Sequence, residues 1–301
     1  MSTIEKTSAA GSVATRGRAA KAPPSRLNIV LSKAFWWVAS LGLFAGIWEF
    51  CWYVGWANPM MMPPPHIFIQ EFFEVGRLFD KSTRLGDPSA GMIILTVLKT
   101  IGASTMRVLV GLAFALVGSL AVGMAIRYSP LFGKLCLPTI NLLAPVSPVA
   151  WLPVAMLIFG LGDAPAIFLV YIALFFIMTL ATINLIDTLP PSYVQVARIM
   201  GASRRQIFLQ VILPAILPGL FVVLRLNLFA AWMIVLIAES VGVGGGLGLV
   251  VIIARNTFHA QLAFFTMFLI GLVGFALDVF LREIQRRALY WVPQGQGALR
   301  R

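Results

Sequence analysis

The chain has 301 residues, of which 59% are hydrophobic and only 11% are charged. Soluble domains carry about 25% charged residues, so this composition, with a mean hydropathy of +0.91, excludes an ordinary soluble domain and predicts an integral membrane protein. The formal net charge of +12 gathers at the two ends of the chain rather than on one patch, which fits the positive-inside rule better than nucleic-acid binding.

The first 33 residues are polar and basic, with six Lys/Arg and one Glu. They contain no apolar core of the kind that a signal peptide needs, so we expect residues 1–33 to form a disordered cytoplasmic tail. Residues 293–301 form a second, short basic tail at the other end. Residues 34–292, between the tails, are predicted to be one transmembrane domain.

Six segments of this domain are long and apolar enough to cross a membrane, which takes about 20 residues in a helix. In chain order they are residues 34–56, 108–126, 135–161, 164–186, 211–241 and 262–281. The third is interrupted by four prolines, which remove helical hydrogen bonds: Pro138, Pro145, Pro148 and Pro153. The predicted fold is therefore an all-α integral membrane protein with about six transmembrane helices.

The charges between the spans predict the topology. Residues 57–91, which include a predicted short surface helix at 68–78, have a charge balance of −1 and suit the outside. Arg127 and Lys134 in one loop, and three Arg against one Asp in residues 187–210, suit the inside. Both termini are therefore predicted to be cytoplasmic.

Residues 187–210 are polar and basic although they lie between two strongly apolar spans. Pro190 and Pro191 end the fourth span, and Ser192 is predicted to cap a short new helix. The apolar residues of that helix recur at helical spacing and predict one apolar stripe: Tyr193, Val194, Ala197 and Met200.

A turn and a second helix are predicted to follow. Gly201 permits a left-handed or tightly turned backbone, and Ser203 can cap a helix that enters the fifth span. Pro214 and Pro218 are expected to bend that entry. A short helix held across the membrane surface in this way can enter a groove on a partner. The alternative is an ordinary interfacial amphipathic helix with basic residues at its edge.

The spacing of this stretch carries a family resemblance. The stretch reads Gln195-Val196-Ala197, three residues, Gly201, nine residues and then Val211-Ile212-Leu213-Pro214. It resembles the coupling loop of ABC-importer permeases, whose pattern is Glu-Ala-Ala, three residues, Gly, nine residues, Ile-x-Leu-Pro. The chain departs from the pattern at Gln195 and Val196, where Glu and Ala are usual. A neutral Gln cannot accept a charge-assisted hydrogen bond as a carboxylate would.

Other segments extend the resemblance over about residues 63–292, to the nitrate, sulfonate, taurine and bicarbonate branch of these permeases. Phe159-Gly160-Leu161-Gly162-Asp163 is similar to the family's Phe-Gly-Ile-Gly-Glu turn. Four further segments resemble other signatures of the family: Gly201 to Arg204, Arg225 to Leu228, Ala231-Trp232 and Ala238-Glu239.

The resemblance implies a fold, a role and partners. It implies a type I importer permease in the bacterial cytoplasmic (inner) membrane, working as a homodimer with a separate ATP-binding subunit and an external solute-binding protein. The residues that it implies for coupling to the ATPase are Gln195, Val196, Ala197, Gly201, Ser203, Arg204 and Pro214. The implied cargo is a small anion such as nitrate, a sulfonate or taurine, bicarbonate or an organic carboxylate; the alternative is a neutral heterocycle such as a vitamin precursor.

The residues themselves indicate no catalytic chemistry. Gly244-Gly245-Gly246 is followed by no Lys and so does not form a phosphate-binding loop. His66 and His259 are isolated, so no metal site and no cofactor is predicted, and Cys51 and Cys136 are expected to be buried thiols. Two rivals stay open: a secondary transporter or channel, for which we see no inverted repeat or carboxylate relay, and a membrane-bound enzyme, for which we see no cluster of His, Asp or Cys.

Five polar residues inside the spans are candidates to line the pathway. Arg225 lies near the middle of the fifth span, and Glu239 lies about 21 Å further along the same helix, so these two cannot pair within it. Arg225 is expected either to face the pathway and favour an anion or to form a structural ion pair. Asn141, Ser147 and Trp151 lie on the proline-interrupted third span, where a broken backbone is expected to line a cavity or to be a packed kink.

Overall fold

The computed structural model describes residues 26–56, 62–70, 72–79 and 89–291, and all the regular structure in these ranges is helical. By its internal contacts the chain forms two units, Met1–Val54 and Gly55–Arg301. The first contains α1 (Arg26–Tyr53), which begins eight residues before the expected start of the first span. Its apolar spanning part is Phe35–Tyr53.

The predicted tails fall mostly on residues whose structure is not described. Residues 1–25 of the first tail, and the whole of the second tail at 293–301, lie outside the described ranges. The boundaries proposed for the transmembrane domain stay predictions.

The second unit is built around four long helices. These are α5 (Ala90–Tyr128), α8 (Asp163–Asp187), α11 (Leu213–Val241) and α13 (Ala260–Ala288). With α1, the described ranges hold five helices long and apolar enough to cross a membrane, or six if a bent helix pair counts as one span. The all-α prediction with about six spans is confirmed.

Apart from residue 71, the surface helix predicted at 68–78 falls on described residues, which are helical. They form α2 (Pro65–Gln70), α3 (Phe72–Gly76) and a 3-10 turn, η1 (Arg77–Phe79). Val75 and Phe79 are buried, and the Phe79 ring packs edge-on against Phe265 of α13 at 6.0 Å between centroids. Phe73 is 46% exposed, so one side of this segment faces outward while its other side packs against the long helices.

Helix α5 is continuous over 39 residues and begins before the predicted second span at 108–126. No proline interrupts it, so nothing ends the helix before that span. It packs closely on α8: a Cβ at Gly111 would lie 2.7 Å from Val170, and one at Gly123 would lie 2.8 Å from Thr182. Small residues at such contacts let membrane helices approach each other closely.

The predicted third span is two helices rather than one interrupted helix. α6 (Pro130–Leu143) is followed by the 3-10 turn η2 (Pro148–Trp151) and α7 (Leu152–Phe159), and the two halves are bent by 101°. Pro145 and Pro148 stand at the break, where they remove backbone donors. At 1.5 Å per residue, neither half alone is as long as the roughly 30 Å hydrocarbon layer.

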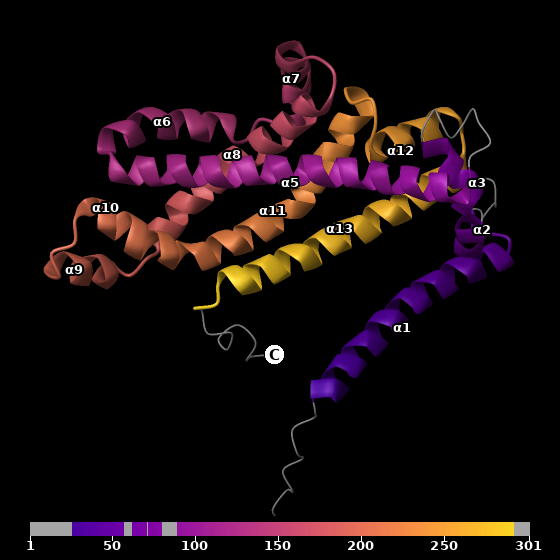
Figure 1. The fold of residues 1–301 in the computed structure, drawn as a ribbon, viewed down its shortest axis with the longest axis horizontal. Helices are drawn as coiled ribbons and strands as arrows, with labels where there is room; N and C mark the ends of the chain where they lie inside the picture. Colours follow the sequence, from indigo (N-terminus) through magenta and orange to yellow (C-terminus); the bar gives the residue numbers. More distant parts are fainter. Residues whose placement is uncertain (1–25, 57–61, 71, 80–88, 292–301) are drawn as a thin grey trace, which may run out of the picture. The chain divides into compact units, whose positions relative to one another are not determined.

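Short elements close the two ends of the second unit (Figure 1). At one end lie α9 (Pro191–Ile199) and α10 (Arg204–Gln206), which continues through a π-helical turn, η3 (Ile207–Ile212), into α11. At the other end lies α12 (Leu247–Asn256), which follows the glycine-rich turn.

Candidate functional site

Helix α9 begins one residue earlier than its predicted cap. Pro190 occupies the N-cap position and Pro191 the first helical position, so Ser192 lies inside the helix and does not cap it. The prediction for Ser192 was wrong because proline fits the first turn of a helix, where its missing N–H costs nothing and its φ is already helical.

The predicted apolar stripe of α9 divides into two faces. Ala197 is buried in a cluster with Ile207, Ile212 and Ile216, and Val194 packs against the same cluster. Tyr193, Val196, Ile199 and Met200 face outward, and Ile199 and Met200 are 85% and 81% exposed.

Four large apolar side chains of α9 and its C-cap residue are thus exposed, and exposed apolar side chains at helical spacing are suited to contact with a partner or a membrane. Gln195 and Arg198, on the same helix, are exposed as well.

The turn after α9 has the predicted geometry. Gly201 has a φ of 78°, and its N–H donates to the Arg198 carbonyl at 3.0 Å while the Ala202 N–H donates to the Ala197 carbonyl at 3.0 Å. These bonds close the C-terminus of the helix with glycine in the left-handed conformation. The chain is thereby turned back toward the membrane spans within three residues.

Ser203 caps the next helix as predicted. Its hydroxyl accepts a bond from the Gln206 N–H, and the Gln206 side chain accepts one from the Ser203 N–H. This reciprocal arrangement satisfies two backbone donors at the helix start. The helix then runs without a break from Arg204 to Val241. Before Pro214 it widens into a π turn, in which the Leu213 N–H donates to the Phe208 carbonyl.

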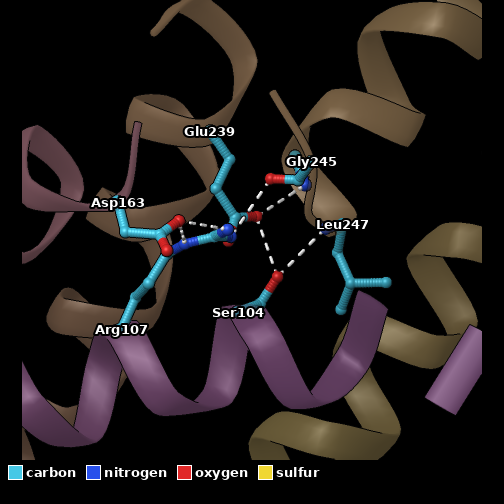
Figure 2. A network of polar contacts seen from close by, with 7 residues as sticks. Ser104, Arg107, Asp163, Glu239, Gly245 and Leu247 are labelled. Atoms are coloured by element: carbon cyan, nitrogen blue, oxygen red, sulfur yellow. Dashed lines mark hydrogen bonds and ion pairs between the residues drawn. The ribbon is translucent and has the colours of Figure 1, made fainter. Parts of the chain in front are cut away.

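A buried ionic network lies at the opposite end of the unit, near α12 (Figure 2). Glu239 is 0% exposed. Its Oε1 accepts a bond from Arg107 Nη1 at 2.5 Å, and its Oε2 accepts bonds from Ser104 Oγ at 2.9 Å and from the Gly248 N–H at 3.0 Å. A buried carboxylate is stable only when paired and hydrogen-bonded in this way.

Arg107 connects this buried carboxylate to the surface. Its Nε and Nη2 donate to Oδ1 of Asp163 at 2.9 and 2.7 Å, and its Nη1 also donates to the Gly245 carbonyl at 3.1 Å. Asp163 is the first residue of α8 and has an exposed side chain. One guanidinium therefore joins α5, the start of α8, the end of α11 and the glycine-rich turn (Figure 2).

The glycine-rich turn is shaped by that carboxylate. Gly246 has a φ of 124°, and a Cβ there would lie 2.3 Å from Cδ of Glu239. No side chain fits between the turn and Glu239. Arg107 was not among the residues predicted from the sequence; the available signal was that Glu239, charged and within a span, needs an opposite charge.

A second ionic cluster involves Arg225. Its Nε donates to Oδ1 of Asp278 at 2.5 Å and its Nη2 to Oδ2 at 3.4 Å. Asp278 also pairs with Arg282, whose Nε lies 3.0 Å from Oδ2. Asp278 is 5% exposed, whereas Arg225 is 40% exposed.

Of the two alternatives for Arg225, the ion pair is present in the structure. The cluster nevertheless keeps a net charge of +1, because two guanidinium groups share one carboxylate. Within the described residues, neither arginine's Nη1 makes a hydrogen bond, so each retains a free donor. The sequence reading missed Asp278, whose signal was a lone acidic residue among the apolar residues of the last span.

The remaining pathway candidates lie along the bent helix pair. Asn141 is exposed on α6, Ser147 is exposed at the N-cap position of η2, and Trp151 is half-buried at the end of η2. Their role in a pathway stays a prediction. The described residues contain no group of three or more His, Cys, Asp or Glu that could hold a metal ion, and Cys51 and Cys136 are free and half-buried.

Comparison with known proteins gives a family match. The model of the family described as "Binding-protein-dependent transport system inner membrane component" matches residues 115–290. The chain is 28% identical over 262 residues to the taurine transport system permease protein TauC of Escherichia coli (strain K12), covering 87% of this chain and 86% of TauC. It is 31% identical over 189 residues to the nitrate import permease protein NrtB of Leptolyngbya laminosa, covering 63% of this chain and 68% of NrtB.

Among solved structures, a chain of the MetNI methionine ABC transporter in an inward-facing conformation is similar in fold. The TM-score is 0.57 at 20% sequence identity, and the match covers 69% of this chain and 100% of that chain. At this identity the likeness supports the arrangement of helices alone.

Proposed function

The chain belongs to the family of binding-protein-dependent transport system inner membrane components, and from this premise we propose that it carries a small anion across the bacterial inner membrane. Membership makes it the permease subunit of a binding-protein-dependent ABC importer, in a family of non-catalytic transport subunits. The secondary-transporter and membrane-enzyme alternatives are thereby set aside.

The observation that supports an anionic cargo is the cluster of Arg225, Asp278 and Arg282. It holds two guanidinium groups against one carboxylate and leaves both arginines partly exposed. A guanidinium presents forked N–H donors that match the oxygens of nitrate, sulfonate or carboxylate groups. An excess positive charge within the spans favours an anion over a neutral heterocycle.

The names of two relatives also support an anionic cargo. TauC is named for taurine transport and NrtB for nitrate import, and the ligands named are a sulfonate and an oxyanion. We propose the same class for this chain: nitrate, a sulfonate such as taurine, bicarbonate or an organic carboxylate.

We propose that the outward face of α9 docks on a separate ATP-binding subunit, with Gln195, Val196, Ala197, Gly201, Ser203, Arg204 and Pro214 as the coupling set. In this set Val196 and Gln195 are exposed for contact, and Ala197 fixes the helix to the apolar cluster beneath it. Gly201 and Ser203 set the turn. Arg204 is exposed at the start of α10, and Pro214 lies where the π turn meets α11.

The other proposed partners are an external solute-binding protein, a second copy of this chain and the membrane lipid. In this arrangement α9 and both termini face the cytoplasm, and α12 and the Arg107–Glu239 network lie at the outer end of the pathway. The pathway-lining candidates are Asn141, Ser147, Trp151, Arg225 and, at the outer end, Glu239.

The function is tested by uptake into proteoliposomes that contain this chain, an ATP-binding subunit and a solute-binding protein encoded beside it. Labelled nitrate, taurine, bicarbonate, a small carboxylate and a neutral heterocyclic vitamin precursor are compared at equal concentration. We expect ATP-dependent uptake of one or more anions. Uptake of the neutral compound alone would overturn the anion proposal and favour the heterocycle alternative.

A further inference from the structure

A groove lies between the last turn of α5 and the start of the helix after α9. Its volume is about 470 Å³, within the roughly 300–1,000 Å³ typical of ligand pockets. It is lined by Met124, Ala125, Tyr128, Arg205, Phe208 and Leu209. All but one of these side chains are apolar or aromatic, and the exception is a guanidinium.

Two ion pairs that join α5 to α8 indicate the level of the groove relative to the membrane. Arg107 pairs with Asp163 at one end of the two helices, and Arg127 pairs with Asp187 at the other. Arg107 and Arg127 are 20 residues apart, about 30 Å along a helix, which equals the thickness of the hydrocarbon layer of a bilayer. A spacing of this length is what we expect if the two pairs lie near the two membrane surfaces.

On this scale the groove crosses one membrane surface. Met124 and Ala125 lie within one turn of Arg127 on its inward side, at the edge of the hydrocarbon layer. Tyr128 and Arg205 lie at the level of the lipid headgroups. The Tyr128 ring packs edge-on against Phe208 at 5.3 Å between centroids, so two aromatic rings in contact line the groove.

The groove's polar atoms are available to a ligand. Arg205 is exposed, and within the part of the chain that the structure describes it forms none of the ion pairs. Arg204, its neighbour, is exposed as well. Basic pockets between membrane helices, at the cytoplasmic side, suit anionic lipid headgroups.

We propose that this groove binds one anionic phospholipid, with its phosphate at Arg205 and the Tyr128 hydroxyl and an acyl chain against Ala125 and Phe208. The proposal rests on the proposed topology, in which α9 faces the cytoplasm, but not on the identity of the cargo. A bound lipid touches the π turn η3, which links the coupling segment to α11. The charge of the bound lipid would therefore affect the stability of the π turn that connects the coupling segment to α11.

The soluble ATP-binding subunit is a less suitable occupant. It would approach the outward face of α9, whereas Met124 and Ala125 lie at the depth of the hydrocarbon layer, where a soluble protein does not reach. A lipid is present at that depth and supplies both an acyl chain and a phosphate.

The experiment uses the full chain with its ATP-binding subunit, purified in detergent and loaded with phosphatidylglycerol or phosphatidylcholine at equal concentration. Native mass spectrometry counts the bound lipid. We expect a preference for phosphatidylglycerol that falls about fivefold in Arg205→Gln, because a basic residue near an anionic surface contributes about 1 kcal/mol. Arg255→Gln, which alters an exposed arginine on α12, is the control and keeps the preference.

A second variant fills the groove without changing charge. Ala125→Phe should remove the bound lipid of both headgroups while its melting temperature shows that the complex is folded. An unchanged preference in Arg205→Gln, or full lipid binding in a folded Ala125→Phe, would overturn the proposal. So would a photo-cross-linker at Leu209 that labels the ATP-binding subunit and no lipid. None of these readouts uses uptake, so a failed anion proposal leaves the lipid result intact.

Discussion

Arg107 and Glu239 lie 132 residues apart in the sequence, and Nη1 of the arginine lies 2.5 Å from Oε1 of the glutamate in the interior of the protein. The pair holds the end of α11 against α5 and fixes the glycine-rich turn above it (Figure 2). Asp163, on the exposed side of the same guanidinium, adds the start of α8.

Breaking the buried pair is expected to destabilise the protein strongly. Arg107→Gln leaves the Glu239 carboxylate buried without its charge partner, and removing one partner of such a pair costs about 3–5 kcal/mol. Asp163→Asn, on the exposed side, should cost about 0–1 kcal/mol. Thermal unfolding in detergent compares the two, and equal melting temperatures would contradict the assignment.

Two neighbouring glycines give a matched test of the turn over Glu239. Gly246→Ala puts a Cβ 2.3 Å from Cδ of Glu239 at a φ of 124°, whereas a Cβ at Gly244 meets nothing within 4 Å. We expect Gly246→Ala to lose folded protein in detergent and Gly244→Ala to behave as wild type. A tolerated Gly246→Ala would show that the turn can move away from the carboxylate.

Gly201 is expected to set the coupling turn through its backbone alone. A Cβ there would meet nothing within 4 Å, but the φ of 78° is strained for a side chain. Gly201→Val should abolish ATP-dependent uptake, because a β-branched residue resists positive φ. Gly201→Asn should retain most of it, because Asn tolerates that conformation. Uptake and co-purification of the ATP-binding subunit are measured together; normal values for both in Gly201→Val would contradict the docking role.

Arg225→Gln should separate transport from stability. Arg282 still pairs with Asp278 in this variant, so the melting temperature should fall little, whereas uptake of the anionic cargo should slow. Asp278→Asn is the comparison, because it leaves two guanidinium groups side by side without their carboxylate and should destabilise the protein more. A stable Arg225→Gln with unchanged uptake would remove Arg225 from the pathway.

Gln195→Glu restores the carboxylate that is usual in this position of the family motif. Assembly should persist and strengthen by about 1 kcal/mol, the difference between a charge-assisted and a neutral hydrogen bond. Binding of the purified ATP-binding subunit measures the change. Loss of binding or of uptake would mean that Gln195 meets an acidic or apolar surface on its partner.

Several local features could be predicted because their causes lie within a few residues. The turn at Gly201 follows from the backbone freedom of glycine, and the cap at Ser203 follows from a hydroxyl three residues before the Gln206 side chain. The prediction that Ser192 caps α9 was wrong because a proline beside it suits the same helix start. The sequence did not show which helices cover the apolar side of the segment at 68–78, because one of them, α13, is distant in sequence.

The sequence by itself determined that this is a helical membrane protein with about six spans and a polar helix-turn-helix stretch at residues 187–210, because hydrophobic length and turn chemistry are local properties. Only the tertiary structure decided which charges meet. Arg107 finds Glu239 and Arg225 finds Asp278, and the halves of the third span separate by 101°. Inside a membrane every charge needs a partner, but the choice of partner depends on which helices pack side by side.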